Sequence, residues 1–291
     1  MKLFGKNKIK TLWSFTQNQN IFRFIFGGRK FIAGETRNIE EKTLELFTLD
    51  YTQGKTYLKN FSFEEKNYWV SIEGATEEIL FLGRFEKPEL PYQKNIIALD
   101  IKTGNILWEN ETFSFLFNTE DILYGIKKGF ESNLIAQIDI RTGEVSRELQ
   151  PDEHLEVFNL RNSSEDYIYE NSNYPLLFEQ ENDSEELTEL FNRICYSKHD
   201  IGSIEYIKKG TLLIFNYYIK FAGEENGLVK EYFENRFAIC NSASGDILFG
   251  DVLNKKTNYC VPDNFFTRDE YLFYLKEKRE LHCIKLTQAT V

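Results

Sequence analysis

The stretch NIIALDIKTGNILWEN, residues 95–110, combines the features that predict the fold of this chain of 291 residues. An apolar run leads to Asp100, Gly104 follows at the fourth position after it, and Trp108 stands at the fourth position after the glycine. Asp accepts hydrogen bonds from backbone N–H groups just ahead of it, and Gly tolerates the positive φ that such a hairpin turn needs. The stretch therefore predicts two antiparallel strands joined by a tight turn.

The same frame recurs along the chain. Its anchor and glycine positions hold Asp50 and Gly54, Asp139 and Gly143, Asn241 and Gly245, and, in a worn copy, Lys285 and Ala289. Successive anchors are 50, 39, 102 and 44 residues apart, and 102 is twice 51, as if one copy had lost its signature. A period of about 40–50 residues is typical of β-propeller blades, each of which is a four-stranded sheet. We therefore expect an all-β chain that forms a single β-propeller domain over residues 1–291.

Strand-like segments between the anchors predict the individual blades. They cover residues 21–61, 67–110, 113–149, 203–251 and 271–286. With an irregular blade over about residues 150–200, the expected number of blades is six, and seven remains an alternative if that region holds two. Bulky residues at the position of Trp108, which include Leu58 and Phe249, are expected to wedge between neighbouring blades, whereas Arg147 breaks this pattern.

The last predicted blade is one strand short, and the beginning of the chain offers a strand without a blade. Residues 8–15, KIKTLWSF, contain Leu12 and Trp13, which match Leu107 and Trp108. We expect this N-terminal strand to complete the last blade and to close the ring, because closure leaves no exposed sheet edge. Trp13 should then occupy the wedge position of Trp108.

The irregular blade is predicted to combine strands and a helix. The strands are expected at residues 156–160, 166–170 and 175–180, and one short helix at residues 183–194. Leu187, Leu190, Phe191 and Ile194 form an amphipathic stripe in that helix, and Asp183 with Glu186 is the expected capping pair. The helix is interpreted as the cover of an irregular blade edge, and a partner-binding or lid element is the alternative.

Composition excludes some classes of partner. The net charge of −11 disfavours nucleic acid and anionic membrane surfaces. No run approaches the ~20 apolar residues that span a bilayer, and a cytoplasmic protein is expected.

The four cysteines, Cys195, Cys240, Cys260 and Cys283, form no CxxC pair, and Cys240 and Cys283 lie in apolar strand-like runs. We expect buried, reduced thiols rather than disulfides or a zinc site.

Two resemblances follow from these motifs. ALDIKTGNILW, residues 98–108, resembles the repeat of quinoprotein-like (PQQ-type) β-propellers. FEEKNYWVSIEG (63–74), GFESNLIAQIDIRTGEV (129–145) and VPDNFF (261–266) resemble an uncharacterised bacterial family of similar length. The quinoprotein resemblance implies a propeller fold, and in dehydrogenases of that group it implies adjacent cysteines and a calcium site. This chain has no adjacent cysteines, so no cofactor, metal site or catalytic residue is transferred.

The sequence contains no recognised catalytic motif. His154, His199 and His282 form no ligand pair at helical or strand spacing, and neither a nucleophile elbow nor a phosphate loop is present. We therefore expect a non-catalytic binding or scaffold propeller whose partner is a protein or peptide rather than a small molecule. The alternative is an enzyme, a hydrolase or lyase, that uses carboxylates at the central channel.

One loop offers candidate binding residues. The connection at residues 83–95 is long for a blade, contains Pro88 and Pro91, and carries Arg84, Glu89 and Tyr92. Long connections often serve a function. These three side chains are the candidate binding residues, and an exposed connector without a role is the alternative interpretation.

Overall fold

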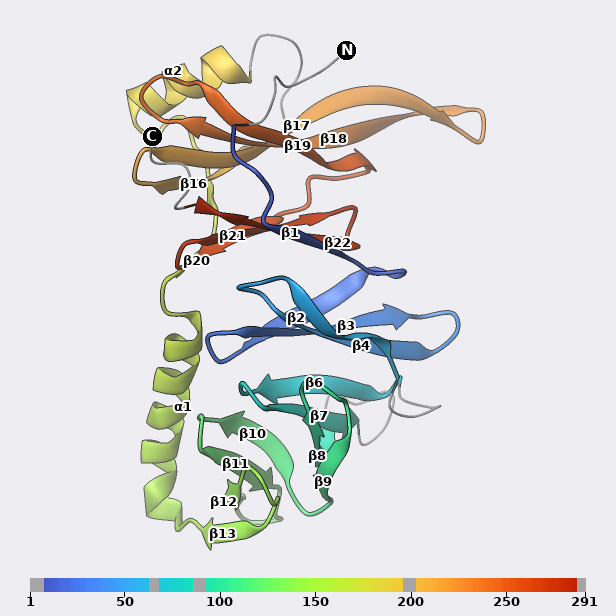
Figure 1. Ribbon diagram of the computed structural model, residues 1–291, viewed down its shortest axis with the longest axis vertical. Coiled ribbons are helices and arrows are strands. Elements are labelled where there is room, and N and C mark those ends of the chain that lie inside the picture. Colours follow the sequence, from blue (N-terminus) through green and yellow to red (C-terminus); the bar gives the residue numbers. More distant parts are fainter. Residues whose placement is uncertain (1–7, 63–67, 86–92, 196–202, 287–291) are drawn as a thin grey trace. The chain divides into compact units, whose positions relative to one another are not determined.

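The computed structural model describes residues 8–62, 68–85, 93–195 and 203–286. The chain divides into two compact units, of which one comprises residues 17–170 and the other residues 1–16 and 171–291. We call them the three-sheet unit and the two-sheet unit after the sheets that they contain. Nearly all regular structure is antiparallel β-sheet, so the expected all-β class is confirmed (Figure 1).

The three-sheet unit consists of three sheets of four antiparallel strands, each formed by strands in chain order. The first sheet contains β2 (Ile21–Gly27), β3 (Phe31–Asn38), β4 (Thr43–Asp50) and β5 (Lys55–Phe61). The second contains β6 (Val70–Ala75), β7 (Ile79–Phe85), β8 (Gln93–Asp100) and β9 (Ile106–Asn110). The third contains β10 (Ser114–Asn118), β11 (Ile122–Lys127), β12 (Leu134–Asp139) and β13 (Val145–Glu148). These are the first three predicted blades.

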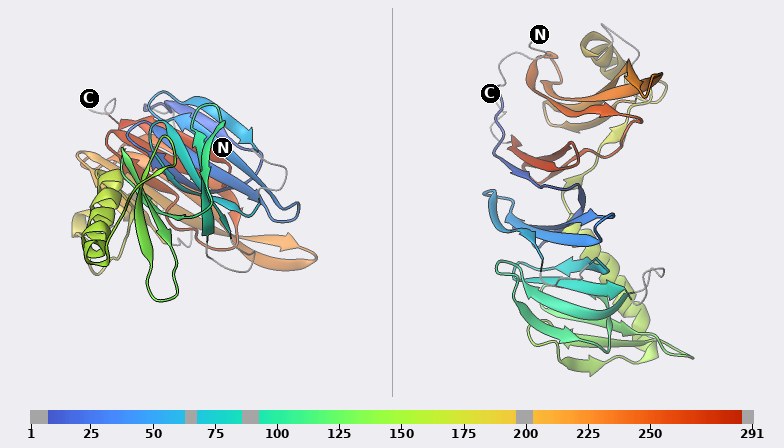
Figure 2. Two further views of the ribbon diagram at one scale, coloured as in Figure 1. Left: turned by 90° about the horizontal axis from the view of Figure 1, so that it is seen from below. Right: turned by 90° about the vertical axis from the view of Figure 1, so that its right-hand side faces the viewer.

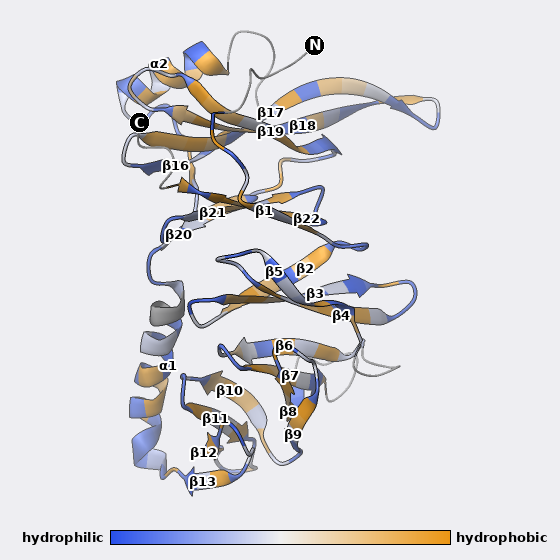
Figure 3. Cartoon of the chain, viewed as in Figure 1, coloured by the Kyte–Doolittle hydropathy of each residue, from blue (hydrophilic) through white to orange (hydrophobic). Residues whose placement is uncertain are grey.

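The sheets of this unit follow one another in layers, with the second sheet between the other two (Figures 1 and 2). One apolar core joins the first and second sheets, and it includes Phe31, Leu46, Leu80 and Leu99. Another joins the second and third sheets around Trp108. Apolar residues run along the strands whereas the turns are mainly hydrophilic (Figure 3), as expected for sheets that bury their faces against each other.

The predicted turn chemistry is confirmed at all four good copies of the repeat. Two consecutive backbone N–H groups donate to the anchor Oδ1 in each copy, and the glycine has a positive φ between 72° and 75°. At Asp100, for example, the N–H groups of Lys102 and Thr103 donate over 3.0 and 2.7 Å. The sequence frame therefore encodes the hairpin turn.

The predicted wedge position is confirmed for Trp108. Its Nε1 donates to the carbonyl oxygen of Ile140, in the next sheet, over 3.0 Å, and only 9% of the residue is exposed. A Cβ atom added at Gly143 would lie 2.5 Å from Cε3 of Trp108. The glycine of one turn thus makes room for the indole of the preceding sheet.

Gly143→Ala should destabilise the protein more than Gly210→Ala, a matched control. Both glycines have positive φ, 74° and 60°, so both substitutions cost about 1–2 kcal/mol of backbone strain. Gly210 has no atom within 4 Å of the added Cβ, whereas Gly143 faces the ring of Trp108. Displacing that ring should lower the free energy of unfolding by about 1–3 kcal/mol more. Urea denaturation followed by tryptophan fluorescence measures the difference, and equal losses would contradict the wedge.

The two-sheet unit contains two sheets of five strands. The first has the order β1 (Trp13–Thr16), β22 (Glu280–Lys285), β21 (Tyr271–Lys276), β20 (Phe265–Arg268) and β14 (Ser172–Asn173). The second has the order β15 (Leu176–Leu177), β16 (Glu205–Lys209), β17 (Leu212–Glu225), β18 (Leu228–Asn241) and β19 (Ile247–Thr257). The second sheet is the predicted fifth blade with a short added edge strand.

The first strand of the chain pairs with its last strand, as the sequence predicted. Trp13 lies opposite Cys283 in an antiparallel register, just as Trp108 lies opposite Ala98. Both partners stand two residues before their repeat anchors, so Trp13 occupies the register position of Trp108. The described residues form five sheets, and their strand pairings do not close a ring, so six blades and ring closure are not confirmed.

The predicted strands at residues 156–160 and 166–170 are wrong. After a 3₁₀ turn, η1 (Pro151–Glu153), this region forms α1 (His154–Tyr169). Pro151 occupies the first turn, and the carboxylate of Glu153 accepts the N–H of Gln150 over 2.9 Å, which starts the helix. The apolar residues Phe158 and Leu160 of the first predicted strand are exposed in this helix.

The predicted short helix is confirmed as α2 (Glu185–Ile194), the second α-helix of the structure. Its N-cap is Ser184, whose hydroxyl accepts the N–H of Leu187 over 3.3 Å, so Asp183 is not the cap. The carboxylate of Asp183 instead accepts the hydroxyl of Tyr206 over 2.5 Å. Leu190 and Phe191 are buried in the apolar core of the second sheet of this unit. Of the expected strand 175–180, only Leu176–Leu177 is a strand.

Candidate functional site

The loop residues proposed from the sequence do not form a described site. Arg84 lies in β7, where its register neighbours are Val70 of β6 and Lys94 of β8. Glu89 and Tyr92 lie outside the described residues. The loop therefore stays a prediction, and the structure directs attention to a cleft elsewhere in the three-sheet unit.

This cleft lies along the first strands of the three sheets and beside α1. Its volume is about 500 Å³, which is within the range of ligand sites. It is lined by Ile25, Phe26, Glu73, Gly74, Ala75, Phe115, Leu116, Phe117, Asn118, Arg161, Ser164, Glu165 and Tyr169. The strands β2, β6 and β10 supply the walls, and one face of α1 supplies the remaining side.

The side chain of Asn118 lies directly against the backbone of Gly74 in the cleft. A Cβ atom at Gly74 would lie 2.4 Å from Oδ1 of Asn118, so glycine leaves the room that this amide side chain occupies. The amide of Asn118 donates to the carbonyl oxygens of Thr119 at 2.9 Å and Ala75 at 3.4 Å. The hydroxyl of Ser164 donates to the carbonyl oxygen of Asn118 over 3.0 Å, which attaches α1 to β10. Hydrogen bonds thus join β6 to β10 and β10 to α1, the elements that bound the cleft.

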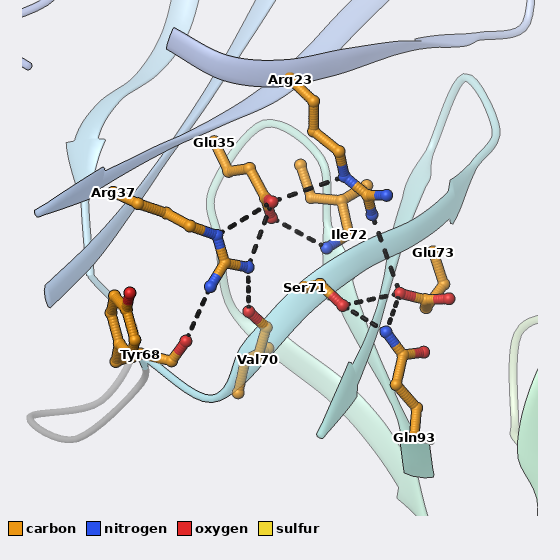
Figure 4. Close-up of polar contacts among 9 residues, drawn as sticks. All are labelled: Arg23, Glu35, Arg37, Tyr68, Val70, Ser71, Ile72, Glu73 and Gln93. Atoms are coloured by element: carbon orange, nitrogen blue, oxygen red, sulfur yellow. Dashed lines mark hydrogen bonds and ion pairs between the residues drawn. The ribbon is translucent and has the colours of Figure 1, made fainter. Parts of the chain in front are cut away.

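The carboxylate of Glu73 reaches the cleft from β6 and is held by three partners (Figure 4). Its Oε1 accepts the hydroxyl of Ser71 over 2.7 Å and also an N–H of the Gln93 amide, and it lies 3.7 Å from Nη2 of Arg23. All three contacts end on the same oxygen. Oε2 points away from these partners (Figure 4), so this oxygen is the one that can receive a further donor.

A second carboxylate, Glu35 of β3, lies in the same polar network but is fully buried. Its Oε1 lies 3.1 Å from Nη2 of Arg37 and 3.4 Å from Nε of Arg23, and its Oε2 accepts the N–H of Ile72 over 3.1 Å. Arg37 also donates to the carbonyl oxygen of Val70 over 2.6 Å. These bonds join the first sheet to the second, so Glu35 is a structural residue.

Burial raises the pKa of Glu73 above its ordinary value. The hydrogen bonds from Ser71 and Gln93 and the charge of Arg23 oppose this effect, and the negative charge of Glu35 adds to it. A carboxylate in a cleft with a raised pKa is a common feature of binding and catalytic sites. Glu73 therefore differs from Glu35, because the carboxylate of Glu73 borders the cleft whereas that of Glu35 is enclosed by protein.

The remaining charges of the cleft belong to α1 and neutralise each other. Nε of Arg161 pairs with Oε1 of Glu165 over 2.9 Å. The hydroxyl of Ser164 is used in its bond to Asn118. Among the described residues, the lining of the cleft contains neither His nor Cys. This arrangement is suited to binding by charge and apolar contact.

The histidine and cysteine side chains considered from the sequence do not form a described metal site. In the part of the chain that the structure describes, no group of three His, Cys, Asp or Glu residues is placed to hold a metal ion. His282 stacks on Tyr274 with ring centroids 4.8 Å apart and lies 3.1 Å from Glu280. Cys240 and Cys283 are buried free thiols, as predicted, and burial raises the pKa of Cys240 to about 12. No described helix is long and apolar enough to cross a membrane.

The comparisons with known proteins reveal similarity but assign no activity. A family described as a domain of unknown function (DUF4905) matches residues 28–108, which cover the first sheet from its first turn and the second up to Trp108. No curated protein matches the chain. Neither of these two comparisons assigns a function to this chain.

Solved structures that resemble the chain include propellers. The β-propeller domain of the Trilobed protease from Pyrococcus furiosus is 13% identical over 93% of this chain and 94% of that chain, with a TM-score of 0.32. A eukaryotic initiation factor is 11% identical over 81% of this chain and 56% of that chain, with a TM-score of 0.32. TolB from Acinetobacter baumannii is 14% identical over 88% and 63% of the two chains, with a TM-score of 0.29. This chain thus spans little more than half of the initiation factor.

Sequence reasoning missed the cleft and Glu73. The signal was an acidic residue beside apolar residues of a strand, which occurs in VSIEGA at Glu73 and in FIAGETRN at Glu35. Charged residues are rarely buried unless they are paired. That rule marks these two carboxylates as unusual, together with Glu45 and Glu205 in other strands, but it does not reveal which of them faces a cleft.

Proposed function

We propose that this protein is a non-catalytic binding domain whose cleft in the three-sheet unit receives a segment of a protein or peptide partner. The observation that carries the proposal is the cleft itself, about 500 Å³ in volume, which the first strands of three sheets and a helix surround. Phe26, Phe115 and Phe117 provide apolar walls, and Glu73 provides a charge. The lining side chains of α1 and Asn118 add polar groups, so the cleft offers apolar and polar contacts together, as ligand sites do.

The broader architecture belongs to the same proposal. We propose a single propeller-like domain of the PQQ repeat type with six blades, closed by the pairing of β1 with β22. Four-stranded sheets in chain order and the confirmed repeat turns support it. The buried free thiols, among them Cys240 and Cys283, accord with a reducing compartment, and a cytoplasmic location is part of the proposal.

Filling the cleft should abolish partner binding. Leu116 lines the cleft in β10, and Leu116→Trp adds a bulky ring there, whereas Ile106→Trp adds the same ring on β9 at an exposed position outside the cleft. Peptides selected from a random display library on the wild-type protein should bind Leu116→Trp at least about tenfold more weakly, which corresponds to about 1.4 kcal/mol. Fluorescence anisotropy measures both affinities.

The control variant and the thermal unfolding curves decide the interpretation. Ile106→Trp should bind the selected peptides like the wild type, and both variants should remain folded. Peptides that bind Leu116→Trp as tightly as the wild type would place the binding surface elsewhere and refute the proposal. A library that yields no binder to the wild-type protein would refute it too.

The enzyme alternative is supported by one feature, the raised pKa of Glu73 beside a cleft. A carboxylate pair of the kind used by hydrolases is the further requirement, and the second carboxylate of the cleft, Glu165, is held by Arg161 at 2.9 Å. Hydrolysis of an ester or glycoside that disappears in Glu73→Gln would favour the enzyme over the binding domain.

A further inference from the structure

The hairpin of β17 and β18 extends beyond the rest of its sheet. The two strands pair with each other over their whole length. On its other side, β17 pairs with β16 only as far as Asn216, and β18 pairs with β19 only from Phe233 onward. Beyond these pairings the hairpin is two-stranded and projects from the sheet (Figure 1). We call this segment, residues 220–232, the arm.

The turn of the arm determines which backbone groups face its open edge. Asn226 and Gly227 both have positive φ, 54° and 76°, which is typical of a two-residue turn closed by a hydrogen-bonded pair, here Glu225 and Leu228. Because hydrogen-bonded residues alternate along an antiparallel pair, the odd-numbered residues of β17 bond to β18. The even-numbered residues therefore direct their N–H and C=O groups away from β18.

Three even-numbered residues lie on the open edge of the arm, namely Lys220, Ala222 and Glu224. No described strand pairs with this edge beyond Asn216. An open strand edge can pair with a further strand, and a two-stranded hairpin by itself is only marginally stable. The arm is therefore a surface to which another strand can add.

The order of charges along this edge is self-complementary. Lys220 is positive, Ala222 is small and neutral, and Glu224 is negative. A second copy of the strand that runs antiparallel presents the same residues in reverse order. When Ala222 lies opposite Ala222 of the second copy, each Lys220 lies opposite a Glu224, and outward-facing residues meet outward-facing residues, as the hydrogen bonding requires. Opposite charges that face each other across two strands stabilise their pairing.

The charged side chains of the edge are able to make these contacts. Glu224 is exposed and forms no ion pair among the described residues. Lys220 pairs with Glu231 of its own chain over 2.7 Å, and its side chain is 34% exposed. An ammonium group has three donors, so Lys220 can bind a second carboxylate without losing the first.

We propose that the arm binds the arm of a second copy of this chain, strand against strand, in a two-fold symmetric dimer. β17 of one copy pairs antiparallel with β17 of the other around Ala222, and the two sheets become one continuous sheet. The arm belongs to the two-sheet unit, so this inference does not depend on the cleft or on the proposed function.

Proline substitutions on the two edges of the arm test this dimer. Ala222→Pro removes an N–H that faces the open edge of β17 and leaves the hydrogen bonds of the hairpin in place. Val229→Pro, the matched control, removes an N–H from the opposite edge, in β18. Sedimentation velocity should show a dimer for the full wild-type chain and for Val229→Pro, and an at least about tenfold weaker dimer for Ala222→Pro.

A charge exchange tests the register of the two strands. Lys220→Glu and Glu224→Lys should each weaken the dimer by about tenfold, because each places like charges opposite each other twice. The double variant should restore most of the affinity, although it still lacks the ion pair of Lys220 with Glu231. The two positions are about 13 Å apart along one strand, so only a contact between copies can explain the restoration.

Thermal unfolding verifies that the variants are folded, and the charge exchange decides alone if Ala222→Pro is not. A wild-type chain that stays monomeric at its highest soluble concentration would overturn the inference, as would a dimer that Ala222→Pro leaves unchanged. A dimer that Val229→Pro weakens equally, or a double variant that dimerises no better than the single ones, would also overturn it.

Discussion

Removal of residues 1–16 is expected to unfold or aggregate the protein. The deletion takes away β1, exposes the backbone edge of β22, and removes Phe15 and Ile9, of which only 5% each is exposed. Ile9 belongs to the apolar core between the two sheets of its unit, and its N–H donates to the carbonyl oxygen of Leu248 over 3.2 Å. Burial of one such side chain contributes about 1.5–3 kcal/mol. Two of them reach the lower end of the roughly 5–15 kcal/mol that stabilises a domain.

A permuted chain is the matched control for this deletion. It begins at Gln17 and carries residues 8–16 after residue 291 through a flexible linker. Because β1 and β22 are antiparallel, a short connection lets the moved strand return to its place. The permutant should recover soluble, cooperative unfolding that the deletion lacks, as measured by size-exclusion chromatography and circular dichroism. A deletion variant as monomeric and stable as the full chain would disprove the role of β1.

Replacement of Glu35 by Gln should be the most destabilising single change in the polar network of the three-sheet unit. The carboxylate is fully buried between two arginines and accepts the N–H of Ile72. Removing one partner of a buried ion pair costs about 3–5 kcal/mol, because the remaining charge loses its compensation. Glu35→Gln removes this compensation from the charge of Arg37, whose side chain is only 12% exposed. Urea denaturation at neutral pH should show the loss.

Glu73→Gln is the matched control and should not lower the stability of the protein at pH 7. The pKa of Glu73 is raised in the folded protein, chiefly by burial, so the folded state takes up a proton more readily than the unfolded chain. Its carboxylate therefore lowers stability as the pH rises through this raised pKa, and it has no such effect below the pKa of the unfolded chain. The Gln variant should unfold at an equal or higher temperature than the wild type at pH 7 and lose any advantage on acidification. A large loss at pH 7 would show that Glu73 is structural, like Glu35.

Local features of the chain were predictable from the sequence, and features that depend on packing were not. The turn at Asp100 and Gly104 is determined by residues within it, so its hydrogen bonds followed from residue type. The register of Trp13 followed from the same repeat. The contacts of Glu73 depend instead on how β6 meets β2 and β8, since Arg23 and Gln93 are distant from it in sequence.

The error at α1 has a different physical cause. Leu155, Phe158 and Leu160 are exposed, so the helix lacks the apolar stripe by which helices are usually recognised. The start signal, Pro151 with Glu153, is readable in the sequence but was not used in the prediction. Because α1 forms one side of the cleft, this error also concealed the candidate site.

Hydrogen–deuterium exchange of the wild-type protein, with and without a saturating selected peptide, tests the binding cleft most directly. We expect slower exchange in the bound state at the backbone amides of residues 73–75 and 115–118 and in the segment of α1 around Arg161 and Glu165. Protection confined to other parts of the chain, with these segments unchanged, would contradict it.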